Sequence, residues 1–106
     1  MRKAHIKIYD KQAGILTEHN SKHYVFQYDV GYTGLSISLT MPVTEQSYEF
    51  ETFPPFFDGL LPEGIQLEGL LKRHKIDKTD YFSQLLVTGN DFVGAVTVEE
   101  FNSENE

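Results

Sequence analysis

The sequence predicts one α+β domain, in which a small, mainly antiparallel sheet of about five strands carries two or three helices on one face. Two observations lead to this fold class. Apolar and polar residues alternate with period two in the first half of the chain, and apolar stripes of helical period follow in the second half. A length of 106 residues with 40% hydrophobic residues suits a single compact domain. We expect that domain to span residues 1–100, and the acidic tail 101–106 to be disordered.

Six segments alternate apolar and polar residues and are expected to be strands: 4–9, 15–19, 23–29, 35–39, 47–52 and 93–98. The first two would form a hairpin around a turn at Gln12–Gly14. The alternation is clearest in 35–39, where three aliphatic side chains would point inward and two serines outward. The segment 47–52 is expected to be a short edge strand. The Gly-Ala pair of 93–98 indicates a close approach of another backbone or side chain.

The first expected helix follows Gly64, because Leu67, Leu70, Leu71 and His74 share one helical stripe. Basic residues lie near its C-terminal end, where they complement the helix dipole. On this stripe His74 is expected to be half-buried.

The second expected helix runs from about Lys78 to Thr88. Asp77 fits the N-cap, and Ile76 and Tyr81 fit the two positions of a hydrophobic staple. Gly89 fits a left-handed C-terminal cap. The expected buried face consists of Tyr81, Phe82, Leu85 and Leu86.

Composition excludes several classes of function. The net charge of −7 argues against direct binding of nucleic acid, which needs clustered lysine and arginine, although it leaves docking to a basic protein face open. The chain contains no cysteine and no apolar run long enough for a signal peptide or a membrane span. We therefore expect a soluble, cytoplasmic protein without disulfides.

Catalytic, metal-binding and cofactor-binding residues are not evident. His19 and His23 could face each other across a hairpin near Asp29, but no further histidine or cysteine has the spacing to complete a metal site. Hydrolytic catalysis by Glu63 is not indicated, because no second carboxylate or histidine is expected beside it. The sequence also lacks the groups that bind phosphates in kinases. We expect no catalytic residue, no metal and no cofactor.

The segment 56–64 is the most informative part of the chain. Its apolar residues Phe57, Leu60 and Leu61 are expected to anchor the first helix to the sheet. Pro62 is expected in the first helical turn, since proline has no N–H to leave unsatisfied there. An exposed Ile65 rimmed by polar residues would then be an interface anchor. The expected partner-binding residues are Glu63, Gly64, Ile65, Gln66 and Glu68.

The sequence of this segment, Phe56-Phe57-Asp58-Gly59-Leu60-Leu61-Pro62-Glu63-Gly64, resembles the signature of the N-terminal subdomain of HipA-type toxin kinases. The order of elements resembles that subdomain from about His5 to Val98. Residues 89–95 also match its recurrent Gly-x-Asp-x-x-Gly-Ala motif. The resemblance implies structural roles for Gly89, Asp91 and Gly94, as for the signature residues up to Pro62.

The kinase domain itself is missing, and a free-standing copy of this subdomain resembles the HipS family, the small antitoxins of tripartite HipBST systems. The resemblance implies an antitoxin that is not an enzyme and that binds and inhibits a HipT-like Ser/Thr kinase toxin. A HipB-like helix-turn-helix protein would supply DNA binding through the complex. The alternative is an N-terminal fragment of a full-length HipA-like kinase, packing on the kinase N-lobe. A small adaptor domain with an unrelated partner is a third possibility.

Overall fold

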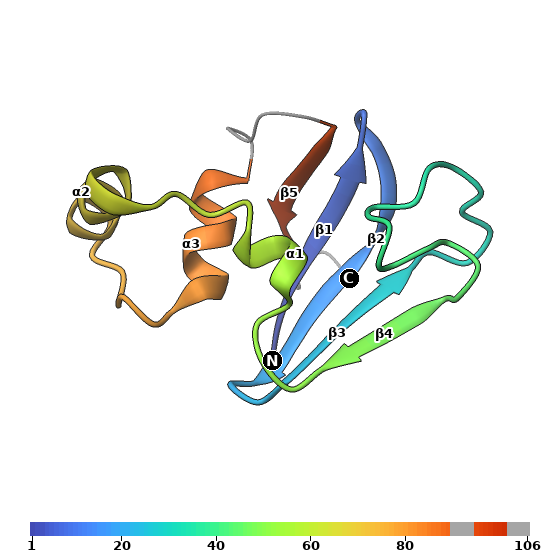
Figure 1. Cartoon of the computed structure of the whole chain (residues 1–106), viewed down its shortest axis with the longest axis horizontal. Coiled ribbons are helices and arrows are strands. Elements are labelled where there is room, and N and C mark those ends of the chain that lie inside the picture. The colour runs from blue at the N-terminus through green and yellow to red at the C-terminus, as the bar shows by residue number, and fades with distance from the viewer. Residues whose placement is uncertain (90–94, 102–106) are drawn as a thin grey trace.

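The computed structural model describes residues 1–89 and 95–101, which contain one five-stranded antiparallel sheet and three helices (Figure 1). The strands are β1 (Arg2–Ile8), β2 (Lys11–Asn20), β3 (His23–Tyr28), β4 (Ser47–Phe50) and β5 (Val96–Glu100). The helices are α1 (Pro55–Asp58), α2 (Gly64–His74) and α3 (Tyr81–Thr88). The predicted α+β class is confirmed. The predictions for Asp91, Gly94 and most of the acidic tail fall outside the described residues.

The sheet has the strand order β4-β3-β2-β1-β5, and every neighbouring pair is antiparallel. The first strand of the chain therefore lies beside the last described strand, and β4 forms the opposite edge. The predicted edge strand at 47–52 is confirmed as β4.

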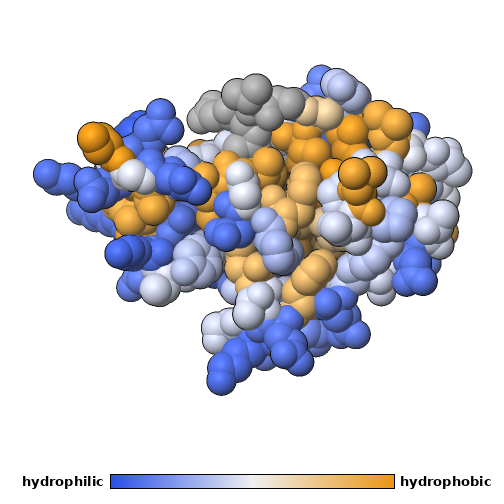
Figure 2. Space-filling model, in the orientation of Figure 1, coloured by the Kyte–Doolittle hydropathy of each residue, from blue (hydrophilic) through white to orange (hydrophobic). Residues whose placement is uncertain are grey.

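One face of the sheet carries the hydrophobic core. Alternate side chains of β1, β2 and β3 are buried on it, as the period-two pattern predicts. The fully or almost fully buried apolar residues of the strands are Ala4, Ile6, Ile8, Ala13, Leu16, Tyr24, Phe26, Tyr28 and Val98. Figure 2 shows apolar residues gathered over the centre of the molecule, with hydrophilic residues dominating the end that carries α2.

The helices contribute unequally to this core. Phe57 of α1 and Phe82 and Leu85 of α3 have no exposed surface. In α2 only Leu70 is buried, and Figure 1 shows α2 on the far side of α3 from the sheet. α1 and α3 thus cover the sheet, whereas α2 is peripheral.

The first hairpin turns at Tyr9 and Asp10, and the predicted turn at Gln12–Gly14 is wrong. Both turn residues have positive φ, 50° and 66°, which is the pattern of a two-residue loop that follows the right-handed twist of a hairpin. Gly14 instead lies inside β2, where an added Cβ would meet the carbonyl oxygen of Gln27 at 2.4 Å. This glycine permits close approach of β3.

The predicted strand 35–39 is also wrong, because these residues belong to the loop between β3 and β4. Ile37 is buried, but Leu35 and Leu39 are 63% and 101% exposed. The hydroxyl of the buried Tyr28 accepts a hydrogen bond from Ile37 N at 2.8 Å and donates one to the Met41 carbonyl, and these two bonds shape the loop. Since β4 already pairs with β3, this segment has no free edge on β3 to join.

α3 begins at Tyr81, later than predicted, and its N-cap is Asp80, whose side chain accepts a hydrogen bond from Ser83 N at 3.2 Å. Asp77 accepts from Thr79 N and Thr79 Oγ1 at 2.9 Å, which closes a separate turn. Tyr81 is 41% exposed and does not belong to the buried face. The predicted N-cap Asp77 is therefore wrong, and Asp80, three residues later, caps the helix.

Gly89 is not the predicted left-handed cap, since its φ is −56°. An added Cβ at Gly89 would lie 2.0 Å from the Val98 carbonyl oxygen, and the Gly89 carbonyl accepts a hydrogen bond from Val98 N at 3.1 Å. Gly89 is therefore required by the contact between the end of α3 and β5.

Candidate partner-binding surface

The segment that leads from α1 to α2 is anchored at its apolar residues. α1 runs from Pro55 to Asp58 with Gly59 as its C-cap, and Leu60 N and Leu61 N donate to the carbonyls of Phe57 and Asp58 at 3.0 and 3.1 Å. Phe57 and Leu61 are buried as predicted, whereas Leu60 is half-buried and packs against the core. Asp58 and Gly59 are exposed.

The turn into α2 depends on one glycine. Gly64 is the first residue of the helix and has φ +60°, and no atom lies within 4 Å of the position of an added Cβ. The backbone conformation, not a lack of space, therefore favours glycine here. Pro62 lies before the helix, so its predicted place in the first helical turn is wrong.

Glu63 occupies the N-cap position with an extended backbone, φ −130° and ψ 165°, and makes no side-chain capping hydrogen bond. Its carbonyl accepts from Leu67 N at 3.4 Å. The Glu63 side chain is exposed and projects its charge near the N-terminal end of the helix, where a carboxylate is favoured.

Ile65 stands out on this surface because it is 85% exposed. Glu63, Gly64, Gln66 and Glu68 are exposed around it in the sequence, while Leu67 turns partly inward. The predicted exposure of Ile65 is confirmed, and the five predicted partner-binding residues form one exposed helix start. We call Glu63, Gly64, Ile65, Gln66 and Glu68 the α2 surface. Its role in binding stays a prediction.

The rest of α2 is stabilised mainly by local features. Leu70 is buried and Leu67 and Leu71 are half-buried, but His74 is exposed, contrary to prediction. Three basic residues occupy the last turn, and the helix ends in a left-handed Lys75 with φ 55°. Glu63 at the N-cap and the basic residues at the other end complement the helix dipole.

A charged cluster between the sheet and α3 was not foreseen from the sequence. Arg2 Nε lies 2.7 Å from Glu18 Oε1, and its Nη2 lies 2.9 Å from Asp80 Oδ1. Nη1 donates to Ser83 Oγ at 2.8 Å, and the guanidinium carbon lies 4.9 Å from the centre of the Phe82 ring. The N-terminal position of Arg2 in the sequence gave no signal of these partners, which come from β2 and α3.

The cluster shifts the pKa of its members. Hydrogen bonding to Glu18 raises the pKa of Arg2, and burial together with a hydrogen bond to Glu18 raises the pKa of Tyr24 to about 12. Burial alone would raise the pKa of Asp80, but hydrogen bonds from Arg2 and Ser83 outweigh it and lower that pKa. The ionised form of Asp80 is therefore the one that the fold stabilises.

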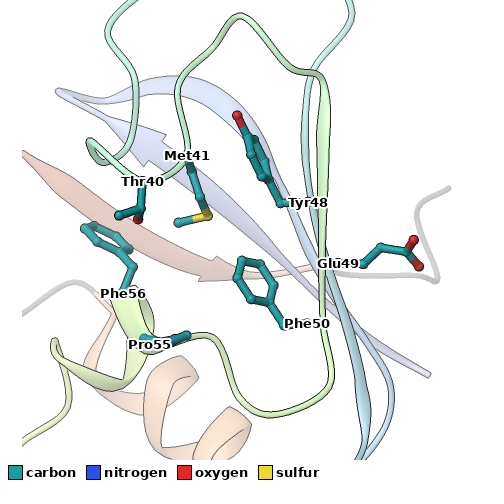
Figure 3. A pocket seen from close by; sticks show the side chains of 7 residues that line it. All are labelled: Thr40, Met41, Tyr48, Glu49, Phe50, Pro55 and Phe56. Carbon is teal, nitrogen blue, oxygen red and sulfur yellow. The ribbon is translucent and has the colours of Figure 1, made fainter.

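An apolar pocket beside the edge strand was also missed. It has a volume of about 260 Å³ and lies between β4, α1 and the β3–β4 loop (Figure 3). Its lining consists of Thr40, Met41, Tyr48, Glu49, Phe50, Pro55 and Phe56. The alternation of Tyr48, Glu49 and Phe50 predicted the edge strand, but only the fold brings α1 and the loop beside it.

Metal binding has little support in the described residues. His19 and His23 do lie together, with stacked rings 4.5 Å apart, and His23 Nε2 lies 2.9 Å from Glu49 Oε1. Within residues 1–89 and 95–101, no group of three or more histidine, aspartate or glutamate side chains is arranged to hold a metal ion. In the same residues, no helix combines the length and the apolar character needed to cross a membrane.

Comparison with known proteins places this arrangement in a family. The family model described as HipA N-terminal domain matches residues 4–99. A solved structure, described as the N-terminal domain of HipA toxin, superimposes with a TM-score of 0.76 at 27% identity, covering 97% of this chain and 95% of that chain.

Two relatives in sequence differ in length. An uncharacterized protein of Haemophilus influenzae is 32% identical over 100 residues, which cover 94% of this chain and 93% of the relative. A putative kinase of Sinorhizobium fredii, Y4dM, is 30% identical over 103 residues, which cover 88% of this chain and 25% of the kinase. Because the family model spans nearly the whole sequence and the fold agrees with it, the chain belongs to the HipA N-terminal domain family.

Proposed function

We propose that this chain is an antitoxin of the HipS type, which binds and inhibits a HipT-like Ser/Thr kinase toxin in trans. The observation that carries the proposal is the Haemophilus influenzae relative, which matches over 93% of its own length and so presents the same domain in a protein of similar size. In this proposal the domain restrains a kinase that lacks it. A HipB-like helix-turn-helix protein supplies the DNA contacts within the complex.

The proposed contact is the α2 surface. Ile65 offers an exposed apolar side chain at a helix start that is held by the buried Phe57 and Leu61. Such an anchor, rimmed by polar groups, has the composition of a small interface centre. Because α2 contributes little to the core, a partner can cover it without competing with the contacts that hold the fold together.

The second candidate function is that of the N-terminal part of a full-length HipA-like kinase, in which the same domain packs on the kinase N-lobe. The Sinorhizobium fredii relative favours it, since the match spans only 25% of that putative kinase. An immunoblot of the native source separates the two functions. A product of the length of this chain supports the antitoxin, whereas a product several times larger supports the kinase.

The test of the proposed function is co-expression with a HipT-like kinase encoded beside this chain, with growth rescue and co-purification measured together. The antitoxin proposal expects both for the unaltered chain. Failure of both would refute it.

The test of the α2 surface uses Ile65→Glu, which places a charge where an apolar group should lose its water. Affinity for the kinase should fall at least about tenfold, roughly 1.4 kcal/mol. The melting temperature should hardly change, because glutamate is well tolerated at an exposed helix start. Calorimetric titration and thermal melting on the same sample measure both.

Val30→Glu is the matched control, since Val30 is 90% exposed in the β3–β4 loop and the change in charge is the same. It should bind the kinase as the unaltered chain does. Equal losses from both substitutions would indicate a general effect of charge. Full binding by the Ile65 variant would place the interface elsewhere.

A further inference from the structure

A second surface lies at the β4 edge of the sheet, away from α2 (Figure 1). β4 pairs with β3 on one side, and no strand in the described part of the chain pairs with its other side. Tyr28 N donates a hydrogen bond to the Gln46 carbonyl at 2.8 Å, which shows which residues of β4 bond to β3 and which face outward. By the alternation of the antiparallel ladder, Tyr48 and Phe50 direct their main-chain groups toward β3, and Ser47 and Glu49 direct theirs outward. Unpaired groups of this kind are a template for another strand.

The two faces of this edge differ in chemistry. The core-side face carries Tyr48 and Phe50 and opens into the pocket of about 260 Å³, which has room for a large apolar side chain. Figure 3 shows the Glu49 side chain pointing away from the other six lining residues, toward the opposite face of the sheet. A strand added to β4 would therefore place alternate side chains over the pocket and beside Glu49.

The charge around β4 indicates what kind of strand fits. Glu45, Glu49 and Glu51 are exposed before, within and after β4. Glu49 Oε1 lies 2.9 Å from His23 Nε2, and the whole chain carries a net charge of −7. Two copies joined through β4 would bring these carboxylates together, which disfavours self-association. A segment with positive side chains has the complementary charge.

From this geometry we propose that the outer edge of β4 binds an extended, basic segment of a partner protein as a sixth strand. The segment alternates apolar residues, one of which enters the pocket beside Phe50 and Phe56, with lysine or arginine residues beside Glu49. This surface is separate from the α2 surface and does not depend on the kinase being the partner.

The probe is a synthetic ten-residue peptide of alternating lysine and leucine, blocked at both ends, titrated into the whole protein at low salt while backbone amide resonances are recorded. Binding should shift the resonances of Ser47–Phe50 and of the pocket residues Met41 and Phe56. The control is the same peptide with methylated backbone nitrogens, which cannot donate to the sheet. It should bind at least about tenfold more weakly. Equal binding of the two peptides would overturn the proposal, and this comparison needs no variant of the protein.

Two substitutions sharpen the test. Ser47→Pro removes an outward donor and leaves the ladder to β3 intact, so it should weaken binding at least about tenfold without loss of folding. Glu49→Gln should weaken binding by about two- to fivefold at low salt. Asp10→Asn makes the same change of charge in the distant β1–β2 turn and should have no effect. Equal effects of Glu49→Gln and Asp10→Asn would mean that the peptide is held by non-specific attraction to the negative charge of the protein.

Sedimentation velocity of the free protein tests whether a second copy of this chain occupies the β4 edge. A monomer at all concentrations agrees with the proposal. A dimer that Ser47→Pro dissociates would show that the edge takes a second copy of this chain, and would overturn the proposal of a basic partner.

Discussion

α2 and α3 differ in what holds each helix in place. α3 has eight residues and buries Phe82, Gln84 and Leu85, whereas α2 has 11 residues and buries only Leu70. α3 is also tied to β1 and β5, through the bonds of Arg2 to Asp80 and Ser83 and through the Gly89–Val98 contact. The comparison teaches that α3 is part of the scaffold, while α2 is a locally stabilised helix with most of its surface free for another molecule.

The strongest test of this difference compares the same substitution in both helices. Leu85→Ala removes a side chain with no exposed surface and should lower the free energy of unfolding by about 2–5 kcal/mol. Leu70→Ala should cost at most about 2 kcal/mol, because Leu70 lies outside the main core cluster, where the site can relax. Urea denaturation of both variants measures the two values. Equal costs would mean that α2 is as much a part of the core as α3.

Two glycines provide the next comparison. Gly89→Ala forces a Cβ toward the Val98 carbonyl and should destabilise the fold by about 1–3 kcal/mol through displacement of β5. Gly69→Ala in the middle of α2 meets no atom within 4 Å and should stabilise the protein by about 0.5–1 kcal/mol. Thermal melting should therefore move in opposite directions. A loss of stability from Gly69→Ala would reveal a contact of α2 that the structure does not contain.

Loss of the N-cap of α3 should have a smaller effect on the free energy of unfolding. Asp80→Ala removes the N-cap acceptor and a partner of Arg2 and should cost about 1–2 kcal/mol. Asp77→Ala breaks only the turn to Thr79, which lies outside the helix, and should cost less. Urea denaturation at neutral pH compares them, and the reverse order would reassign the cap.

The lowered pKa of Asp80 also predicts a dependence of stability on pH. Since the folded state lowers this pKa, the stabilisation is present above the unfolded value of about 3.8 and is lost as the pH falls through the folded value. The unaltered protein should therefore lose more stability than Asp80→Asn on acidification below about pH 5. Asp10→Asn, in the exposed turn, is the matched control and should follow the unaltered protein.

The residue pattern within a segment predicted those helices and strands whose formation depends mainly on that segment. The alternation of Tyr24, Phe26 and Tyr28 gave β3 and its buried face, and the apolar stripe around Leu70 gave α2. The segment 35–39 has an equally clear alternation but forms no strand, because pairing requires a free edge and β4 already occupies that of β3. Whether an edge is free depends on contacts between segments far apart in the sequence.

The same reasoning explains the partial success at the candidate sites. The exposure of Ile65 follows from the turn at Gly64 and from a helical stripe that leaves Ile65 out, so it was predictable. The cluster around Arg2 joins residues as far apart as Arg2 and Asp80, 78 positions along the chain. The pocket beside Phe50 is built within residues 40–56, but it forms only where a loop, β4 and α1 fold against one another. Gly89 was recognised as a special position, but its reason lies in β5 and not in its own helix.

The pairing of β1 with β5 has a consequence for the time course of synthesis. β1 is made first, yet its second edge is filled only when Val96–Glu100 have been added. At about 5–20 residues per second, the ribosome needs on the order of 5–20 s to make the chain between these two strands. For that interval the second edge of β1 stays unpaired, so the nascent protein remains open to aggregation and to chaperones until Val96–Glu100 have emerged.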